Sequence, residues 1–162
     1  LAAYQNEKIL FYSFMISDLV VNVQLMDTLS DTPKEVPTLK FLESNIVATG
    51  SKKGVVKIYS ISKSGKISLL KKITNHKDVK ISDIDLYQDS DETYIITSSF
   101  DNTLNITNLN NSEELITFKD YDGWVTDMYF DENEKRIYSI SQDTFLRYWL
   151  IDSKDILKLL KK

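Results

Sequence analysis

With 162 residues, of which 42% are hydrophobic, 27% charged and 11% aromatic, the chain has the composition of one globular domain and not of a disordered protein. A net charge of −4 disfavours nucleic acid as the default partner, and the chain lacks the run of eighteen apolar residues that crosses a membrane. The absence of cysteine, the single histidine and only four glycines argue against disulfides, metal sites and phosphate-binding loops. We therefore expect no cofactor and no metal, and an intracellular location that is cytoplasmic or nuclear.

Four windows of fourteen residues align without a gap, and each contains an apolar run, a polar turn and an alternating run. The windows are residues 1–14, 48–61, 96–109 and 138–151. Their turn positions are Asn6, Lys53, Asp101 and Asp143, which lie 47, 48 and 42 residues apart. A period in the forties is typical of a protein built from structural repeats.

The residue pattern predicts strands and not helices, because apolar and polar residues alternate and β-branched and aromatic residues are abundant. A further strand is expected before three of the windows, at 37–42, 81–87 and 125–130. Another is expected after each window, at 19–26, 67–73, 114–118 and 156–160, the last of which fits a short amphipathic helix equally well. Four short strands per copy are the inventory of one β-propeller blade, so the predicted fold is all-β.

At these positions the sequence resembles the WD-repeat β-propeller family, and the resemblance spans nearly the whole chain. The turn aspartate of that family is matched by Asp101 and Asp143, its tryptophan by Trp149 and its histidine by His76. The aspartate that usually follows the tryptophan is matched in none of the copies. The resemblance therefore describes a divergent member of the family.

The other departures concern single copies of the repeat. Asn6 and Lys53 occupy the position of the turn aspartate in the first two copies. Thr107 takes the place of the tryptophan in the third copy, and Tyr121 stands in for the histidine in the fourth.

The resemblance implies four-stranded antiparallel blades in a single propeller segment that covers residues 1–162. The blades are expected at about 1–33, 34–75, 76–120 and 121–162, and the first lacks its opening strand. Propellers close into rings of at least four blades, and an open row would leave sheet edges exposed. We therefore expect the chain to be part of a larger propeller, completed by further blades or by another polypeptide.

His76, Ser99 and Asp101 have two possible roles. A nucleophilic triad, as in a hydrolase, would need the serine hydroxyl on one ring nitrogen of the histidine and the carboxylate on the other. The resemblance implies instead an internal hydrogen-bond network that ties strand ends together, with Asp143 and Trp149 as further members. The chain contains no nucleophile elbow, so we favour the structural role, expect no catalytic residue and keep the hydrolase as the alternative.

Charge is distributed unevenly along the chain. Residues 51–80 carry nine lysines against one aspartate, a net of +8, whereas residues 81–134 carry fourteen acids against one lysine, a net of −13. The lysines are either ordinary solubilising surface or a basic patch for an acidic protein, a phosphopeptide or RNA. The candidate partner-binding residues are Lys52, Lys53, Lys71, Lys72 and Trp124, the last of which is either a core residue or an interface anchor.

Taken with the lack of a catalytic set, the resemblance implies a non-catalytic scaffold for protein–protein interactions. Its partners would be other protein subunits of a multi-protein complex. The alternative is an accessory subunit of an RNA-modifying or ribosome-assembly complex that uses the lysine-rich blade.

Overall fold

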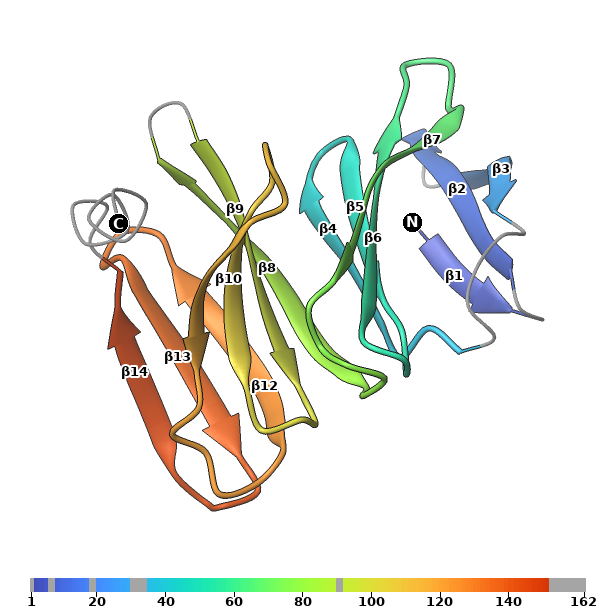
Figure 1. Ribbon diagram of the computed structural model, residues 1–162. Helices are drawn as coiled ribbons and strands as arrows, with labels where there is room; N and C mark the ends of the chain where they lie inside the picture. The colour runs from blue at the N-terminus through green and yellow to red at the C-terminus, as the bar shows by residue number, and fades with distance from the viewer. Residues whose placement is uncertain (1, 6–7, 18–19, 30–34, 90–91, 152–162) are drawn as a thin grey trace.

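The computed structural model describes residues 2–5, 8–17, 20–29, 35–89 and 92–151, and the regular structure within these ranges consists of β-strands (Figure 1). Within these ranges, fourteen strands form four antiparallel sheets of three or four strands each. The predicted all-β fold of small blade-like sheets is therefore confirmed. The turn position Asn6 and the predicted strand or helix at 156–160 lie outside the described residues.

In every sheet, strands that follow one another in the chain are also neighbours in space. The first sheet contains β1 (Ala2–Gln5), β2 (Lys8–Ser17) and β3 (Val20–Leu29). The second contains β4 (Thr38–Glu43), β5 (Ile46–Gly50), β6 (Val55–Ile61) and β7 (Ile67–Thr74). The third contains β8 (Ile81–Asp89), β9 (Glu92–Ser99), β10 (Leu104–Asn108) and β11 (Glu114–Phe118). The fourth contains β12 (Val125–Asp131), β13 (Arg136–Ser141) and β14 (Leu146–Leu150).

The hydrophobic core consists of three clusters, and each cluster fills the space between two neighbouring sheets. We call the face of a sheet that packs on the next sheet in the chain its forward face, and the opposite one its rear face. Alternate residues of a strand point to opposite faces, so an inner sheet needs apolar residues on both. The ninth and eleventh residues of the first three windows are buried on forward faces: Ile9, Phe11, Val56, Ile58, Leu104 and Ile106.

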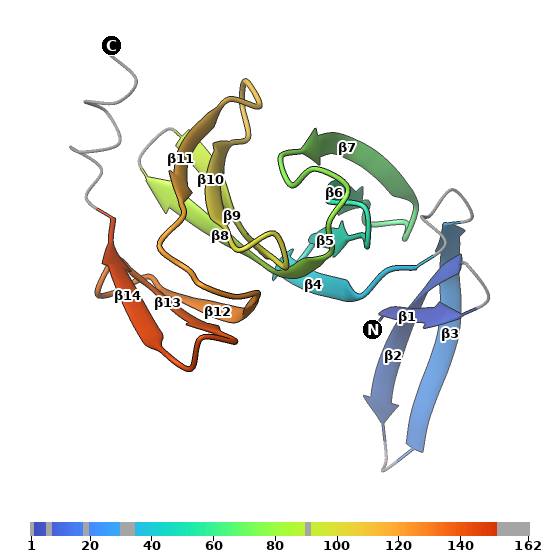
Figure 2. The same ribbon diagram turned by 60° about the horizontal axis from the view of Figure 1, so that its bottom comes forward.

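The first strands of the second, third and fourth sheets lie next to one another, so these sheets form a row (Figure 2). Hydroxyl groups connect these strands. Thr38 Oγ1 in β4 donates to the carbonyl oxygen of Ser82 in β8 at 2.8 Å, and Ser82 Oγ donates to that of Val125 in β12 at 2.6 Å. Across the described residues the row does not close into a ring.

The turns between the second and third strands of the second, third and fourth sheets share one backbone conformation. Their seventh window residues, Gly54, Asn102 and Thr144, have φ angles of 68°, 66° and 70°. Glycine and asparagine adopt this left-handed region readily, whereas a β-branched residue is strained there. The repeat therefore extends to the backbone of the turn.

Thr144 offers a direct test of this strain. Replacing Thr144 by asparagine, the residue at the same position of the third sheet, should raise the free energy of unfolding by about 1 kcal/mol. Urea unfolding of the two proteins measures the difference. Thr74→Asn, on an exposed residue of β7 that lacks a positive φ, is the matched control and should bring no gain. An equal gain in both variants would contradict the explanation by strain.

Candidate functional site

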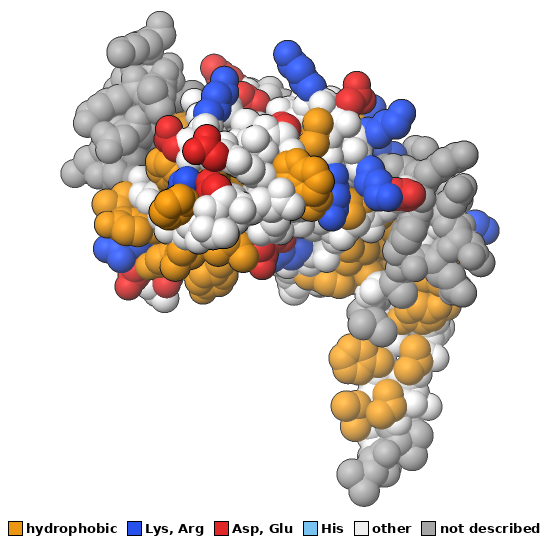
Figure 3. Space-filling view, turned by 90° about the horizontal axis from the view of Figure 1, so that it is seen from below, with side chains coloured by type: hydrophobic (Ala, Val, Ile, Leu, Met, Phe, Trp, Pro, Cys, Tyr) orange, Lys and Arg blue, Asp and Glu red, His pale blue; other side chains and the backbone are white. Residues whose placement is uncertain are grey.

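The loops that lead into the sheets and the turns between second and third strands meet at one end of the row, which we call the loop face. The backbone amide of Phe100 in one such turn donates to the carbonyl oxygen of Lys80 at 3.0 Å. In the next turn, the amide of Gln142 donates to the carbonyl oxygen of Trp124 at 3.0 Å. These loops and turns lie at the bottom of Figure 1, and Figure 3 views the molecule from this end. The loop face comprises residues 51–54, 75–80, 100–103, 119–124 and 142–145.

An aromatic stack stands on the loop face between the third and fourth sheets. The rings of Phe100 and Trp124 lie 4.6 Å apart and are nearly parallel, with an angle of 10° between their planes. The ammonium group of Lys80 lies 4.2 Å from the centre of the Phe100 ring, within the range of a cation–π contact. Trp124 is 46% exposed, so the structure places it at the surface and not in the core.

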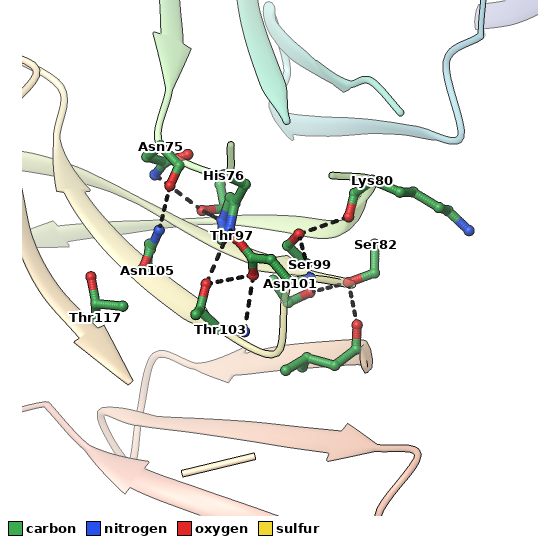
Figure 4. Close-up of polar contacts among 12 residues, drawn as sticks. Asn75, His76, Lys80, Ser82, Thr97, Ser99, Asp101, Thr103, Asn105 and Thr117 are labelled. Atoms are coloured by element: carbon green, nitrogen blue, oxygen red, sulfur yellow. Dashed lines mark hydrogen bonds and ion pairs between the residues drawn. The ribbon is translucent and has the colours of Figure 1, made fainter. Parts of the chain in front are cut away.

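Below this surface, His76 is the centre of a buried hydrogen-bond network (Figure 4). Its Nδ1 lies 2.9 Å from Asp101 Oδ2 and 3.1 Å from Thr103 Oγ1, and its Nε2 lies 2.8 Å from Thr97 Oγ1. Thr103 Oγ1 also donates to Asp101 Oδ1 at 2.6 Å. The network connects the loop before the third sheet with β9 and with the turn that follows it.

Asp101 is held in its charged form by this network. Burial alone would raise the pKa of Asp101, but the hydrogen bonds from His76 and Thr103 outweigh burial and keep this pKa below its usual range. Both ring nitrogens of His76 have partners, and His76 and Thr97 are fully buried. These contacts tie the loop before the third sheet to β9 and to the turn at Asp101.

The Ser99 hydroxyl is not the hydrogen-bond partner of His76. Its hydroxyl donates to the carbonyl oxygen of Lys80 at 2.9 Å and accepts from the amide of Asp101 at 3.1 Å. The hydroxyl that meets the imidazole belongs to Thr97, two residues earlier in β9. Sequence reasoning missed Thr97, although a hydroxyl residue recurs at the second position of three windows: Thr49, Thr97 and Ser139.

The fourth sheet has a related network in which a tyrosine replaces the histidine. The Tyr121 hydroxyl lies 2.8 Å from Ser139 Oγ and accepts from Trp149 Nε1 at 2.9 Å. Burial raises the pKa of Tyr121, so the hydroxyl is neutral and can both donate and accept. Trp149 therefore takes part in a bracing network of the fourth sheet.

Asp143 has other partners than Tyr121. Its Oδ2 lies 2.8 Å from Arg147 Nη2 and accepts from the amide of Asp122 at 3.1 Å. The Arg147 guanidinium, together with the Ser141 hydroxyl, keeps the pKa of Asp143 far below its usual range. Asp143 thus ties the loop before the fourth sheet to β14 through a charge pair.

In the third sheet the position of the family tryptophan is filled by smaller polar groups. Thr107 is buried there, and Asn75 Nδ2 donates to its Oγ1 at 3.0 Å. The backbone oxygen of Asn75 accepts from Asn105 Nδ2 at 3.2 Å. Hydrogen bonds therefore replace the apolar contact that an indole would make at this point.

The four candidate lysines belong to two different parts of the second sheet. Lys52 and Lys53 lie in the turn between β5 and β6, and Lys52 forms an ion pair with Glu35. Lys71 and Lys72 lie within β7. Lys71 Nζ donates to the carbonyl oxygen of Leu109 at 2.7 Å and so ties the second sheet to the third.

Together, the sheets and their bracing networks define an all-β protein made of propeller-like blades. Residues 67–108 match the family model described as "WD domain, G-beta repeat". The match runs from β7 to the end of β10 and contains His76, Thr97 and Asp101. The chain therefore contains a WD40 repeat, and this repeat supports its membership of the WD-repeat family.

A search among curated proteins finds no matching relative. Within the described residues, no helix has the length and apolar character required to span a membrane. The same part of the chain holds no group of three or more His, Cys, Asp or Glu residues placed to share a metal ion.

Proposed function

We propose that the protein is a non-catalytic scaffold that binds another protein subunit through its loop face. The observation that carries this proposal is the exposed stack of Trp124 on Phe100, with Lys80 beside it. Tryptophan is among the residues that contribute most to binding energy at protein interfaces. A WD40 repeat agrees with a general role in protein interactions. We propose in addition that the protein is a subunit of a multi-protein complex.

The bracing networks support this role because they hold the loops of the loop face in place before a partner binds. The His76 network orders the loop that contains Lys80, and Asp143 ties the loop that contains Trp124 to β14. A rigid surface loses less conformational entropy on association, so more of the contact energy is available for affinity. We further propose that each of the four sheets is one blade of a single propeller segment.

Both signs of charge occur on the loop face, which carries five lysines and five aspartates. Lys52, Lys53 and Lys77 lie on exposed parts of the loop face, and Lys80 stands beside the aromatic stack. Lysines at the edge of an interface accelerate the encounter with a negatively charged partner. The proposed partner is therefore a protein with a pocket that accepts the indole of Trp124 and an acidic group that faces Lys80.

RNA is the alternative partner, and the placement of the lysines disfavours it. Lys52 is paired with Glu35 and Lys71 with backbone carbonyls, and the two lysine pairs belong to a turn and to a strand. Phosphate contacts predict an affinity that falls steeply with ionic strength. A salt titration with single-stranded RNA tests this. Steep salt dependence that disappears when Lys52, Lys53, Lys71 and Lys72 are replaced by glutamate would support RNA instead.

Trp124→Ala should abolish stoichiometric binding of the partner. Loss of a central aromatic anchor costs about 2 kcal/mol or more, which corresponds to roughly a thirtyfold lower affinity. The measurement is a quantitative pull-down from native extract with the wild-type chain and the variant as baits. Phe41→Ala, which removes an exposed aromatic side chain of β4 away from the loop face, is the matched control and should retain the partner. Equal recovery with both variants would contradict the proposed site.

A further inference from the structure

A polar hollow lies where the loop before the third sheet meets β10 and β11. It has a volume of about 410 Å³, and every residue that lines it is polar or charged, which excludes an apolar ligand. Figure 4 shows five of the lining residues: Asn75, Asp101, Thr103, Asn105 and Thr117. The third sheet packs on a neighbouring sheet on each side, so this hollow is not part of an uncovered end face.

Two buried oxygen atoms of the lining residues lack a hydrogen-bond donor. Within the described residues, Asn75 Oδ1 and Asn105 Oδ1 have no partner, and Asn105 is only 1% exposed. The amide of Asn105 cannot be turned over, because its Nδ2 donates to the carbonyl oxygen of Asn75 at 3.2 Å and to Glu114 Oε2 at 3.4 Å. A buried acceptor without a donor retains the cost of its lost hydration. The hollow therefore requires hydrogen-bond donors from outside the protein.

The hydroxyl donors of the hollow are already used within the protein. Thr103 Oγ1 donates to Asp101 Oδ1 at 2.6 Å, and Thr117 Oγ1 donates to Glu114 Oε1 at 2.6 Å. A hydroxyl group has only one proton to donate, so neither threonine can serve a ligand as a donor. The wall formed by these residues thus offers acceptors, two of which are carboxylates. Such a wall fits a ligand group that only donates hydrogen bonds and carries a positive charge.

We propose that this hollow binds the guanidinium group of an arginine. A guanidinium presents five N–H donors in one plane, whereas an ammonium group has three and is more strongly hydrated. Five donors can serve Asn75 Oδ1, Asn105 Oδ1 and a carboxylate at the same time. Glu114 is exposed and its contact with Asn105 is long at 3.4 Å, so its side chain can move aside to admit the ligand and then pair with it.

Two lysines of the lining bear on the source of the arginine. Lys77 and Lys119 are exposed, and neither has an ion-pair partner among the described residues. A free arginine has an α-carboxylate that can lie against these ammonium groups, whereas an arginine within a polypeptide has none. The guanidinium is common to both sources. The site does not include Trp124, so it goes beyond the proposed partner surface and does not depend on it.

The test is a titration of the chain with N-acetyl-L-arginine amide, followed by two-dimensional NMR of its amide groups, which detects millimolar binding. The side-chain amide signals of Asn75 and Asn105 should shift. N-acetyl-L-citrulline amide, which has the same shape without the charge, should bind at least about tenfold more weakly. Free L-arginine is the source if it binds more tightly than the capped form and loses this advantage when Lys77 and Lys119 are replaced by glutamine. Equal or weaker binding of free L-arginine identifies an arginine within a polypeptide.

Glu114→Gln should lower the affinity for the capped arginine at least about tenfold, because it removes the carboxylate that pairs with the guanidinium. Glu113→Gln is the matched control, since Glu113 is exposed, does not line the hollow and should leave the affinity unchanged. Circular dichroism of each variant verifies that the β-structure is retained. The proposal would be overturned by unshifted Asn75 and Asn105 signals at millimolar probe, which means that only water fills the hollow. Equal binding of the citrulline probe, tighter binding of N-acetyl-L-lysine amide, or equal losses in the two variants would overturn it as well.

Discussion

Gly54→Ala is expected to lower the free energy of unfolding by about 4 kcal/mol. Gly54 has a φ of 68°, a conformation that costs an alanine about 1–2 kcal/mol. A Cβ at this position would also overlap the carbonyl oxygen of His76. Backbone atoms cannot move aside as a side chain does, so the turn of the second sheet would have to separate from the loop before the third.

Urea unfolding followed by circular dichroism measures this loss of stability. Gly65→Ala is the matched control, because Gly65 has a φ of 84° but its added Cβ would meet the flexible end of the Met26 side chain. The control should lower the free energy of unfolding by about 1 kcal/mol, because only the conformational cost of the positive φ applies to it. If both variants lost the same stability, the close approach of Gly54 to His76 would not be a constraint on the fold.

His76→Ala is expected to cost about 3 kcal/mol of stability at neutral pH. The substitution removes a fully buried ring and leaves Asp101 and Thr97 without their principal partner. Buried polar groups that lose a partner retain the cost of desolvation. Thr103→Val, which removes a hydrogen bond of Asp101 but keeps the imidazole, should cost only about 1 kcal/mol.

The His76 variant should also respond less to acid than the wild type. The folded-state pKa of Asp101 lies below its unfolded value, so its contribution to stability is present above about pH 4 and is lost as the pH falls through the folded pKa. Without His76 this pKa returns towards its usual value and the contribution shrinks. Asp143 contributes acid sensitivity to both proteins, so the difference between the two unfolding curves from pH 7 to pH 2 reports on the His76–Asp101 pair. Parallel curves would contradict the bracing role.

Much of the fold could be predicted from the sequence because the signals are local. The alternation of apolar and polar residues identified β4, β7, β8, β11 and β12 at nearly their observed bounds. The period of the repeat identified equivalent turns, since Gly54, Asn102 and Thr144 share one left-handed conformation. These features depend on residues close together in the chain, and they recur with every copy.

The partners of the site residues could not be predicted, because they depend on strand register and on the loops that reach each strand. Thr97 and Ser99 are both hydroxyl residues of β9 at alternate positions, and only the approach of the loop with His76 decides which one meets the imidazole. The sequence also left undecided whether Trp124 is buried or exposed, because this depends on how its ring packs on Phe100 in the turn of the third sheet.

By itself, the sequence determined that this protein is built from repeated modules of short antiparallel strands with polar turns, because periodicity and turn chemistry act over a few residues. Only the tertiary structure decided which apolar faces are covered. Leu104 and Leu146 occupy the same position of the repeat, yet the first is buried and the second exposed, since burial depends on whether another sheet follows in space.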